Sequence, residues 1–200
     1  MFNSSSIKVA GLLLLAMVTS GCATMYVDNG LKTVSKSDFV APPAPGPVQL
    51  LFTFQTKGAA NARATKQLSE RVTKTVTDSG LFSSVSPEPV AGGAMLSVRI
   101  NNVPITEDAF SKGFATGLTF GLAGSEVTDG YVCTINYQAV AGGTMLESKV
   151  RHAIHTTIGA KKAPANGVKA KSILEAVNTM TDQIVGNGLK ELSHDPHFLQ

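Results

Sequence analysis

The sequence predicts an α+β domain in which two helices pack on one face of a mainly antiparallel sheet. Three observations carry this prediction: apolar residues alternate with polar ones in several stretches, recur every fourth residue in two others, and two alternating runs meet at Gly142-Gly143. Alternation indicates half-buried strands, and four-residue spacing indicates amphipathic helices. Gly-Gly between alternating runs indicates a hairpin. The expected order is β-α-β-β-β-β-α.

The domain is expected to begin with a strand and a long helix. Residues 48–55 alternate, with Val48, Leu50, Phe52 and Phe54 on one face. Residues 59–79 change to helical spacing, and their apolar stripe comprises Ala60, Ala64, Leu68, Val72 and Val76. Gly80 is the expected C-cap, because glycine readily adopts the left-handed conformation that ends helices. Residues 81–85 predict a short return strand, and residues 96–101 a third strand.

The second half is expected to hold a hairpin and a closing helix. Alternation over residues 127–158, broken at Gly142-Gly143, predicts the hairpin. A polar loop over 161–168 follows, and a helix over 168–192 has an apolar stripe of Ile173, Val177, Met180 and Ile184. Residues 48–192 thus form one domain, and residues 193–200 are expected to be a solvated tail.

A near-repeat links Val90–Leu96 with Val140–Leu146, since both contain Val-Ala-Gly-Gly and Met-Leu. One interpretation is duplication of a hairpin unit. The other is that both are Gly-Gly turns entering a strand, a place where few residue types fit.

The first 22 residues have the organisation of a bacterial export signal. Lys8 precedes the apolar run Val9–Val18, and small residues lead to Cys22. The run is too short to cross a bilayer, which takes roughly 20 residues as a helix. The junction resembles a lipobox, although Thr19 stands where Leu, Val or Ile is usual. The resemblance implies cleavage before Cys22 and acylation of its thiol and amine, as by palmitate. Ala23, in place of Asp, favours the periplasmic face of the outer membrane. The alternative is an ordinary secretory signal with an incidental cysteine.

Residues 22–47 are expected to tether the domain to the lipid. Four prolines between Pro42 and Pro47 favour extended polyproline geometry. The favoured interpretation is a stiff spacer above the membrane. The alternative is an arm packed on the domain.

The sequence Asp78-Ser79-Gly80-Leu81-Phe82-Ser83-Ser84-Val85, placed after a long helix, resembles a group of Gram-negative envelope lipoproteins. The group comprises auxiliary lipoproteins of lipid transport, the lipopolysaccharide-assembly lipoprotein and the curli-secretion lipoprotein. The resemblance implies a role in binding or assembly, without catalysis.

A glycine series lies within the insertion 109–124 and is the expected contact or membrane segment. Its residues of interest are Gly113, Phe114, Gly117, Leu118, Gly121 and Leu122. On a helix the three glycines would share one smooth face and the three apolar residues a neighbouring stripe. Three interpretations stay open: a segment that dips into the membrane or contacts another chain, a helix packed on its own sheet, or a glycine-rich mobile loop.

Titratable residues show no catalytic or metal-binding pattern. His152 and His155 are three apart, which on a strand places them on opposite faces. Cys133 lies on an apolar alternating face and is expected in the core. His194 and His197 fall in the expected tail. We therefore predict no enzyme activity, no catalytic or metal site, and no cofactor.

Charge is nearly balanced. The chain has 17 basic and 14 acidic residues, and removal of the signal takes away only Lys8. Nucleic-acid binding therefore has no electrostatic basis. The expected function is a lipid-anchored protein that binds or scaffolds an outer-membrane or transport complex, with an envelope protein or a second copy as partner. The alternative is a periplasmic carrier of a lipid or small amphiphile, and a hydrolase is the least favoured.

Overall fold

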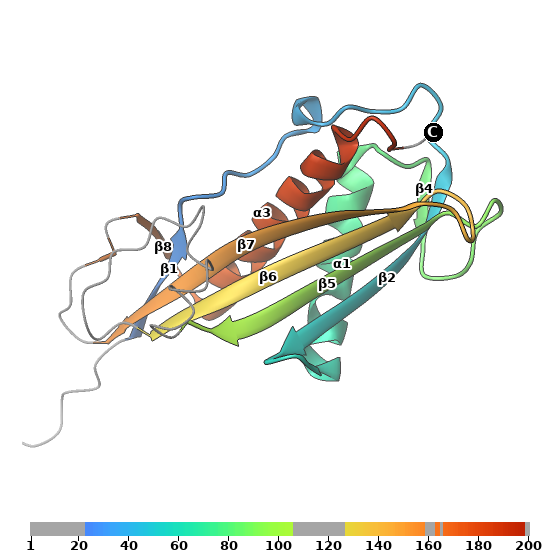
Figure 1. Ribbon diagram of the computed structural model, residues 1–200. Helices are drawn as coiled ribbons and strands as arrows, with labels where there is room; N and C mark the ends of the chain where they lie inside the picture. Colours follow the sequence, from blue (N-terminus) through green and yellow to red (C-terminus); the bar gives the residue numbers. More distant parts are fainter. Residues whose placement is uncertain (1–22, 106–126, 159–162, 165, 199–200) are drawn as a thin grey trace, which may run out of the picture.

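The protein is a two-layer α+β structure, in which both helices cover the same face of one sheet (Figure 1). The computed structural model describes residues 23–105, 127–158, 163–164 and 166–198. The strands lie in the order β3-β2-β5-β6-β7-β1-β8, and β4 pairs with β2. The predicted fold class is confirmed.

The strands follow one another along the chain with helices α1 and α3 inserted. The bounds are β1 Ala23–Asp28, β2 Pro47–Thr56, β3 Ala59–Ala60, β4 Ser84–Ser86, β5 Met95–Pro104, β6 Val127–Gln138, β7 Met145–Ile158 and β8 Gly167–Ala170. The helices are α1 Ala62–Ser79 and α3 Ile173–Ser193, with a short 3-10 turn at Lys36–Asp38. Strands β2 and β5 are parallel because α1 crosses between them, and the pairs from β5 through β8 are antiparallel.

Helix α1 matches the predicted stripe and its predicted end. Leu68, Val72 and Val76 are buried against the sheet. The Asn61 side chain accepts a hydrogen bond from the backbone N–H of Ala64 at 3.0 Å and so caps the first turn. Gly80 closes the helix at φ 71°, a left-handed conformation that favours glycine. The predicted start is wrong by three residues, because Ala59 and Ala60 pair with β2 instead.

The hairpin is confirmed between β6 and β7. Tyr137 lies opposite Leu146, and Val127 lies opposite Thr156. The turn is closed by a hydrogen bond from the Gly143 N–H to the Val140 oxygen at 2.9 Å. The near-repeat makes the same turn, from the Gly93 N–H to the Val90 oxygen at 3.1 Å. The two copies are therefore Gly-Gly turns entering strands, as the second interpretation held.

Helix α3 packs closely on β6 and β7. Its buried residues include Ala176, Met180, Ile184, Val185, Leu189 and Leu192. A Cβ atom added at Gly188 would lie 2.7 Å from Ile135 Cδ1, so glycine lets the helix approach the sheet. The predicted helix start at 168 is wrong, because residues 167–170 form the edge strand β8. Ile173, expected on the apolar stripe, is exposed at the first turn.

Two predictions about the ends of the domain are also wrong. The expected spacer begins with β1, which pairs with β7 on one side and β8 on the other. Leu31 and Phe39 further along pack against the core. The expected solvated tail contains Phe198, whose ring is buried 4.8 Å from that of Tyr137. Both segments carry isolated apolar side chains, and burying these on the domain removes them from water.

Candidate functional site

The predicted contact residues and the predicted lipidation site lie outside the described residues. These are Cys22, Gly113, Phe114, Gly117, Leu118, Gly121 and Leu122. The strands that flank them are described, and their register fixes where the chain leaves and re-enters the sheet. Pro104 pairs with Asp129, Val127 with Thr156, and Ala23 with Ile158. The chain thus enters β1, leaves β5 and enters β6 at one end of the sheet (Figure 1). We call this the anchor end.

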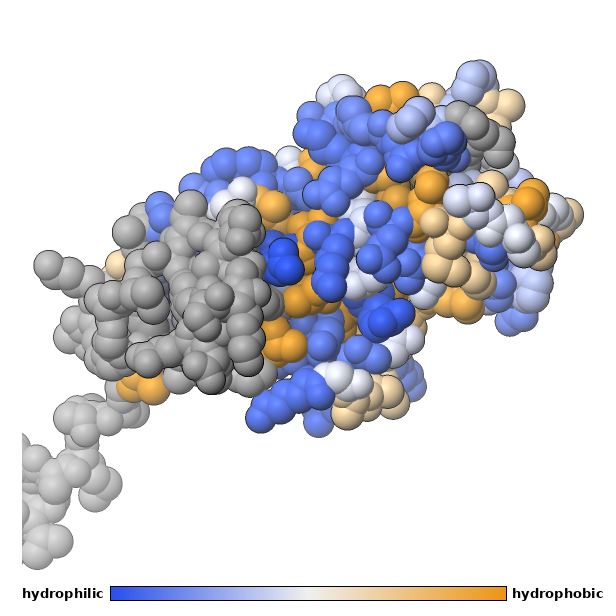
Figure 2. All heavy atoms as spheres, viewed as in Figure 1, coloured by the Kyte–Doolittle hydropathy of each residue, from blue (hydrophilic) through white to orange (hydrophobic). Residues whose placement is uncertain are grey.

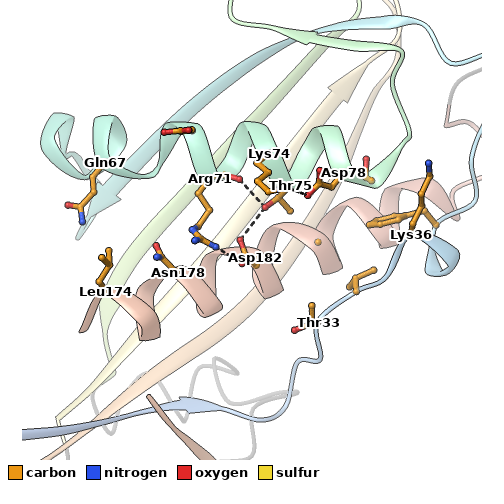
Figure 3. Close-up of a pocket in the computed structure, with 15 residues that line it drawn as sticks. Thr33, Lys36, Gln67, Arg71, Lys74, Thr75, Asp78, Leu174, Asn178 and Asp182 are labelled. Carbon is orange, nitrogen blue, oxygen red and sulfur yellow. Dashed lines mark hydrogen bonds and ion pairs between the residues drawn. The ribbon is translucent and has the colours of Figure 1, made fainter. Parts of the chain in front are cut away.

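A groove of about 560 Å³ lies on the opposite side of the molecule from the open sheet face, between α1, α3 and the arm over residues 33–39 (Figure 3). At its centre the Arg71 guanidinium contacts the Asp182 carboxylate at 2.6 Å, and the Thr75 hydroxyl donates to the same carboxylate at 3.3 Å. Burial raises the pKa of Asp182, although Arg71 and Thr75 favour its ionised form. Both charges are partly exposed, so this pair orients α1 on α3 more than it stabilises the fold.

The arm is held on α3 by polar and apolar contacts. Val34 lies against Gly186, and the Asn187 side-chain amide donates to the Lys32 backbone oxygen at 2.9 Å. The Val40 N–H donates to the Ser193 hydroxyl at 3.2 Å. The arm therefore forms one wall of the groove. This matches the alternative interpretation of the tether, an arm packed on the domain.

The second face of the sheet carries exposed side chains in two adjacent cross-strand rows. One row runs through Leu51, Ser97, Asn136 and Glu147, and the next through Thr53, Arg99, Thr134 and Lys149. Leu51, Arg99, Glu147 and Lys149 are exposed. Figure 2 shows this face, where hydrophilic side chains gather over the middle of the sheet. The helices lie on the other side.

Both histidines of β7 are buried, which the sequence analysis did not foresee. His152 hydrogen-bonds through Nε2 to the Gln183 Oε1 of α3 at 2.7 Å, and its Nδ1 accepts from the Ala153 N–H. This pattern fits a neutral imidazole with the proton on Nε2. Burial lowers the pKa of His152, and the Gln183 hydrogen bond and the Asp28 charge offset this in part.

His155 points to the other face, as the odd spacing predicted. Its Nε2 lies 3.6 Å from the Asp28 carboxylate, and its Nδ1 lies 3.1 Å from the Thr128 hydroxyl. Burial alone would raise the pKa of Asp28, but the bonds with His155 and with the Gly30 N–H hold it below its ordinary value. The edge of the sheet at β1 therefore contains a buried charge whose partners come from β7 and the following turn.

Chemistry that needs a nucleophile or a metal has no matching arrangement in the described part of the chain. Cys133 is buried, as predicted, and burial raises the pKa of its thiol far above neutrality. A thiol that stays protonated is a poor nucleophile. Within residues 23–105 and 127–198, less the undescribed positions, no three His, Cys, Asp or Glu side chains are placed to hold a metal ion. Neither described helix is long and apolar enough to span a bilayer.

Comparison with known proteins finds similarity only at the level of structure. No family model matches the chain, and no curated protein matches it. Two structures of the PelC dodecamer from Paraburkholderia phytofirmans are 14% and 11% identical, cover 84% of this chain and 95% and 96% of theirs, with TM-scores of 0.35 and 0.37. The rare lipoprotein B from Shewanella oneidensis is 11% identical and covers 74% of this chain and 94% of its own, with a TM-score of 0.40. At these values no function is transferred.

Proposed function

We propose that this chain is an exported, non-catalytic lipoprotein that is anchored through Cys22 to the periplasmic face of the outer membrane and binds a protein of the cell envelope. The export part rests on the order cation, apolar run, small residues and cysteine over residues 8–22. The binding part rests on the described fold.

The observation that carries the binding proposal is the open sheet face. Arg99 and Lys149 stand in one cross-strand row, flanked by exposed Leu51 and Glu147 in the next. Charged side chains around an apolar one give a protein interface its orientation and specificity. The strands beneath are fixed by the core on their other side, so this face is rigid before a partner arrives.

A carrier of lipid is less well supported. The place where such a fold would enclose an acyl chain is the space between helices and sheet, and this space is filled by core side chains such as Leu96, Ile100, Ile135, Met180 and Ile184. The groove outside the helices is lined by Arg71, Lys74, Asp78 and Asp182, which suit water better than hydrocarbon.

Site-specific photo-crosslinking in intact cells tests the proposal. A photoreactive residue at position 51 or 99 lies on the open sheet face, and one at Lys74 of α1 is the control on the helix side. We expect positions 51 and 99 to crosslink one discrete envelope protein, or a second copy of the chain, and position 74 not to. The double variant Arg99→Glu, Lys149→Glu should remove the crosslink from position 51. Identical crosslinks from all three positions, or lipid as the only product, would contradict the proposal.

We also propose that residues 109–124 contribute a contact at the anchor end. What supports this is the placement of their flanks beside Ala23, together with a glycine and apolar content unusual for a solvated connector. Gly117→Leu should weaken membrane or partner association while the domain stays folded. If association is unchanged the assignment fails, and if the domain unfolds the segment belongs to the core.

A further inference from the structure

We propose that the corner between β8 and α3, residues 168–174, lies on the bilayer and binds anionic lipid headgroups as a second membrane contact. The inference rests on the proposed anchor at Cys22 and adds to it a surface of the folded domain. We call this surface the β8–α3 corner.

Covalent geometry and strand register place the corner beside the anchor. Cys22 precedes Ala23 directly, and β1 pairs with β8 so that Met25 lies opposite Ala170. Three extended residues reach about 10 Å, and paired strands lie about 4.8 Å apart. Ala170 is thus within about 11 Å of the Cys22 backbone, taking the two distances at right angles. A lipid attached at Cys22 therefore holds the corner close to the membrane surface.

The corner has the side chains that such a position requires. Val168, Ile173 and Leu174 are 56%, 64% and 53% exposed, and Lys169 and Lys171 are exposed between them. Large exposed apolar side chains enter the boundary between headgroups and acyl chains, while lysines bind anionic headgroups. The corner thus combines both parts of an interfacial membrane contact.

No acidic side chain competes for these lysines before Glu175. The sequence contains no Asp or Glu between Glu147 and Glu175. The Glu175 carboxylate is occupied by the backbone N–H of Lys171 at 2.6 Å, part of the cap of α3. This charge pattern is complementary to an anionic surface.

The opposite end of the sheet also exposes apolar residues but lies far from the anchor. Val140 and Met145 are each 55% exposed at the hairpin turn. From Met145 to Ile158 the strand extends about 43 Å. When the anchor end lies on the membrane, the hairpin end points away from it. The hairpin residues therefore serve as a matched control.

Tryptophan quenching by brominated lipid measures this contact directly, because the chain has no tryptophan of its own. One variant carries Val168→Trp at the corner, and another carries Ser83→Trp at the hairpin end. Each full-length mature protein is coupled through the Cys22 thiol to a maleimide lipid in brominated phosphatidylcholine vesicles, with or without phosphatidylglycerol. Cys133 is buried and does not compete. Ile173→Trp is a second corner probe if Val168→Trp unfolds.

We expect strong quenching at position 168 with phosphatidylglycerol, and little at position 83. Lys169→Gln with Lys171→Gln should lower the ratio of attached to detached corners, by about fivefold for each lysine. Lys74→Gln with Lys149→Gln removes the same charge elsewhere and should leave quenching unchanged. Replacing Ile173 and Leu174 by Gln should reduce quenching, whereas replacing Val140 and Met145 by Gln should not.

Equal quenching at positions 168 and 83 would overturn the proposal. Quenching at 168 that does not depend on phosphatidylglycerol or on the two lysines would also overturn it, because the tether alone would then explain the contact. If the lysine variant instead abolishes the crosslink to an envelope protein without changing quenching, the corner binds protein and the membrane proposal fails. Acylation in cells is measured separately, so failure of the anchor itself leaves this result intact.

Discussion

Single residues decide how closely the two layers of this fold approach. Gly188 faces Ile135, and a Cβ atom there would lie 2.7 Å from Ile135 Cδ1. Gly186, half a turn earlier on the same helix, has 3.4 Å to its nearest neighbour, Val34. The same substitution should therefore have opposite effects at the two positions.

Gly188→Ala should lower the free energy of unfolding by about 1–3 kcal/mol, because the added methyl overpacks a filled core. Gly186→Ala is the control, and it should be neutral or stabilising by up to about 1 kcal/mol, since alanine favours the helix. Urea unfolding followed by circular dichroism measures both. Equal stability of the two variants would show that α3 does not pack on β6 as closely as described.

The buried His152 makes stability depend on pH in a definable direction. Burial lowers its pKa below 6.5 in the folded chain, so the unfolded chain takes up the proton first as pH falls. The free energy of unfolding should therefore decrease below pH 6.5 until the folded pKa is passed. The slope for one proton is at most about 1.4 kcal/mol per pH unit. Asp28 and His155 lie nearby, and the lowered pKa of Asp28 adds a loss only below 3.8.

His152→Gln should flatten the dependence of stability on pH between about 7 and 5. Gln183 then has an amide partner in place of the imidazole. His197→Gln, which changes an exposed histidine, should leave the slope as in the wild type. Urea midpoints at several pH values give the slopes. A His152→Gln slope equal to that of the wild type would mean that the imidazole is not buried as a neutral group.

At the scale of elements, the first strand turns the expected tether into part of the sheet. Tyr26 is 9% exposed in β1, between His155 of β7 and Lys169 of β8 in register. Tyr26→Ala should cost about 3 kcal/mol or more of folding stability, as for other buried aromatic residues. Thr33→Ala, an exposed change in the same arm, should cost little. If both variants were as stable as the wild type, the segment would act as the free spacer first expected.

Long periodic elements could be predicted from the sequence, and short ones could not. The stripe of α1 and the alternation of β6 and β7 extend over enough residues for their period to be unambiguous. Strands β1 and β8 are short, and their stability comes from pairing with each other and with β7, which no local pattern reveals. The burial of Phe198 depends in the same way on distant partners, Tyr137 and Phe82.

The candidate surfaces were less predictable than the fold. The sequence drew attention to Cys22 and to residues 109–124, but it could not show that their flanks meet at one end of the sheet. That follows from the β5–β6–β7–β1 register. The groove likewise depends on an arm whose docking on α3 has no sequence signature. A run without acidic residues before Glu175 was visible in the sequence, and it gained meaning only beside the anchor.

At the scale of the whole molecule, the account describes a domain with two different ends and two different faces. One face of the sheet is covered by helices, and the other presents polar side chains to a partner. One end carries the anchor and the β8–α3 corner, and the other carries the Gly-Gly turns. An open face held at a fixed angle to a membrane can present the same residues to every partner molecule.

The central claim is that Cys22 fixes this domain to a lipid surface. Intact mass spectrometry of the protein purified from its envelope fraction tests it most directly, with Cys22→Ala as the control. The account predicts a mature chain that begins at Cys22 and carries acyl chains, and a variant that stays uncleaved or loses its need for detergent. A mature chain cleaved at another residue, without acyl mass and soluble without detergent, would contradict the account.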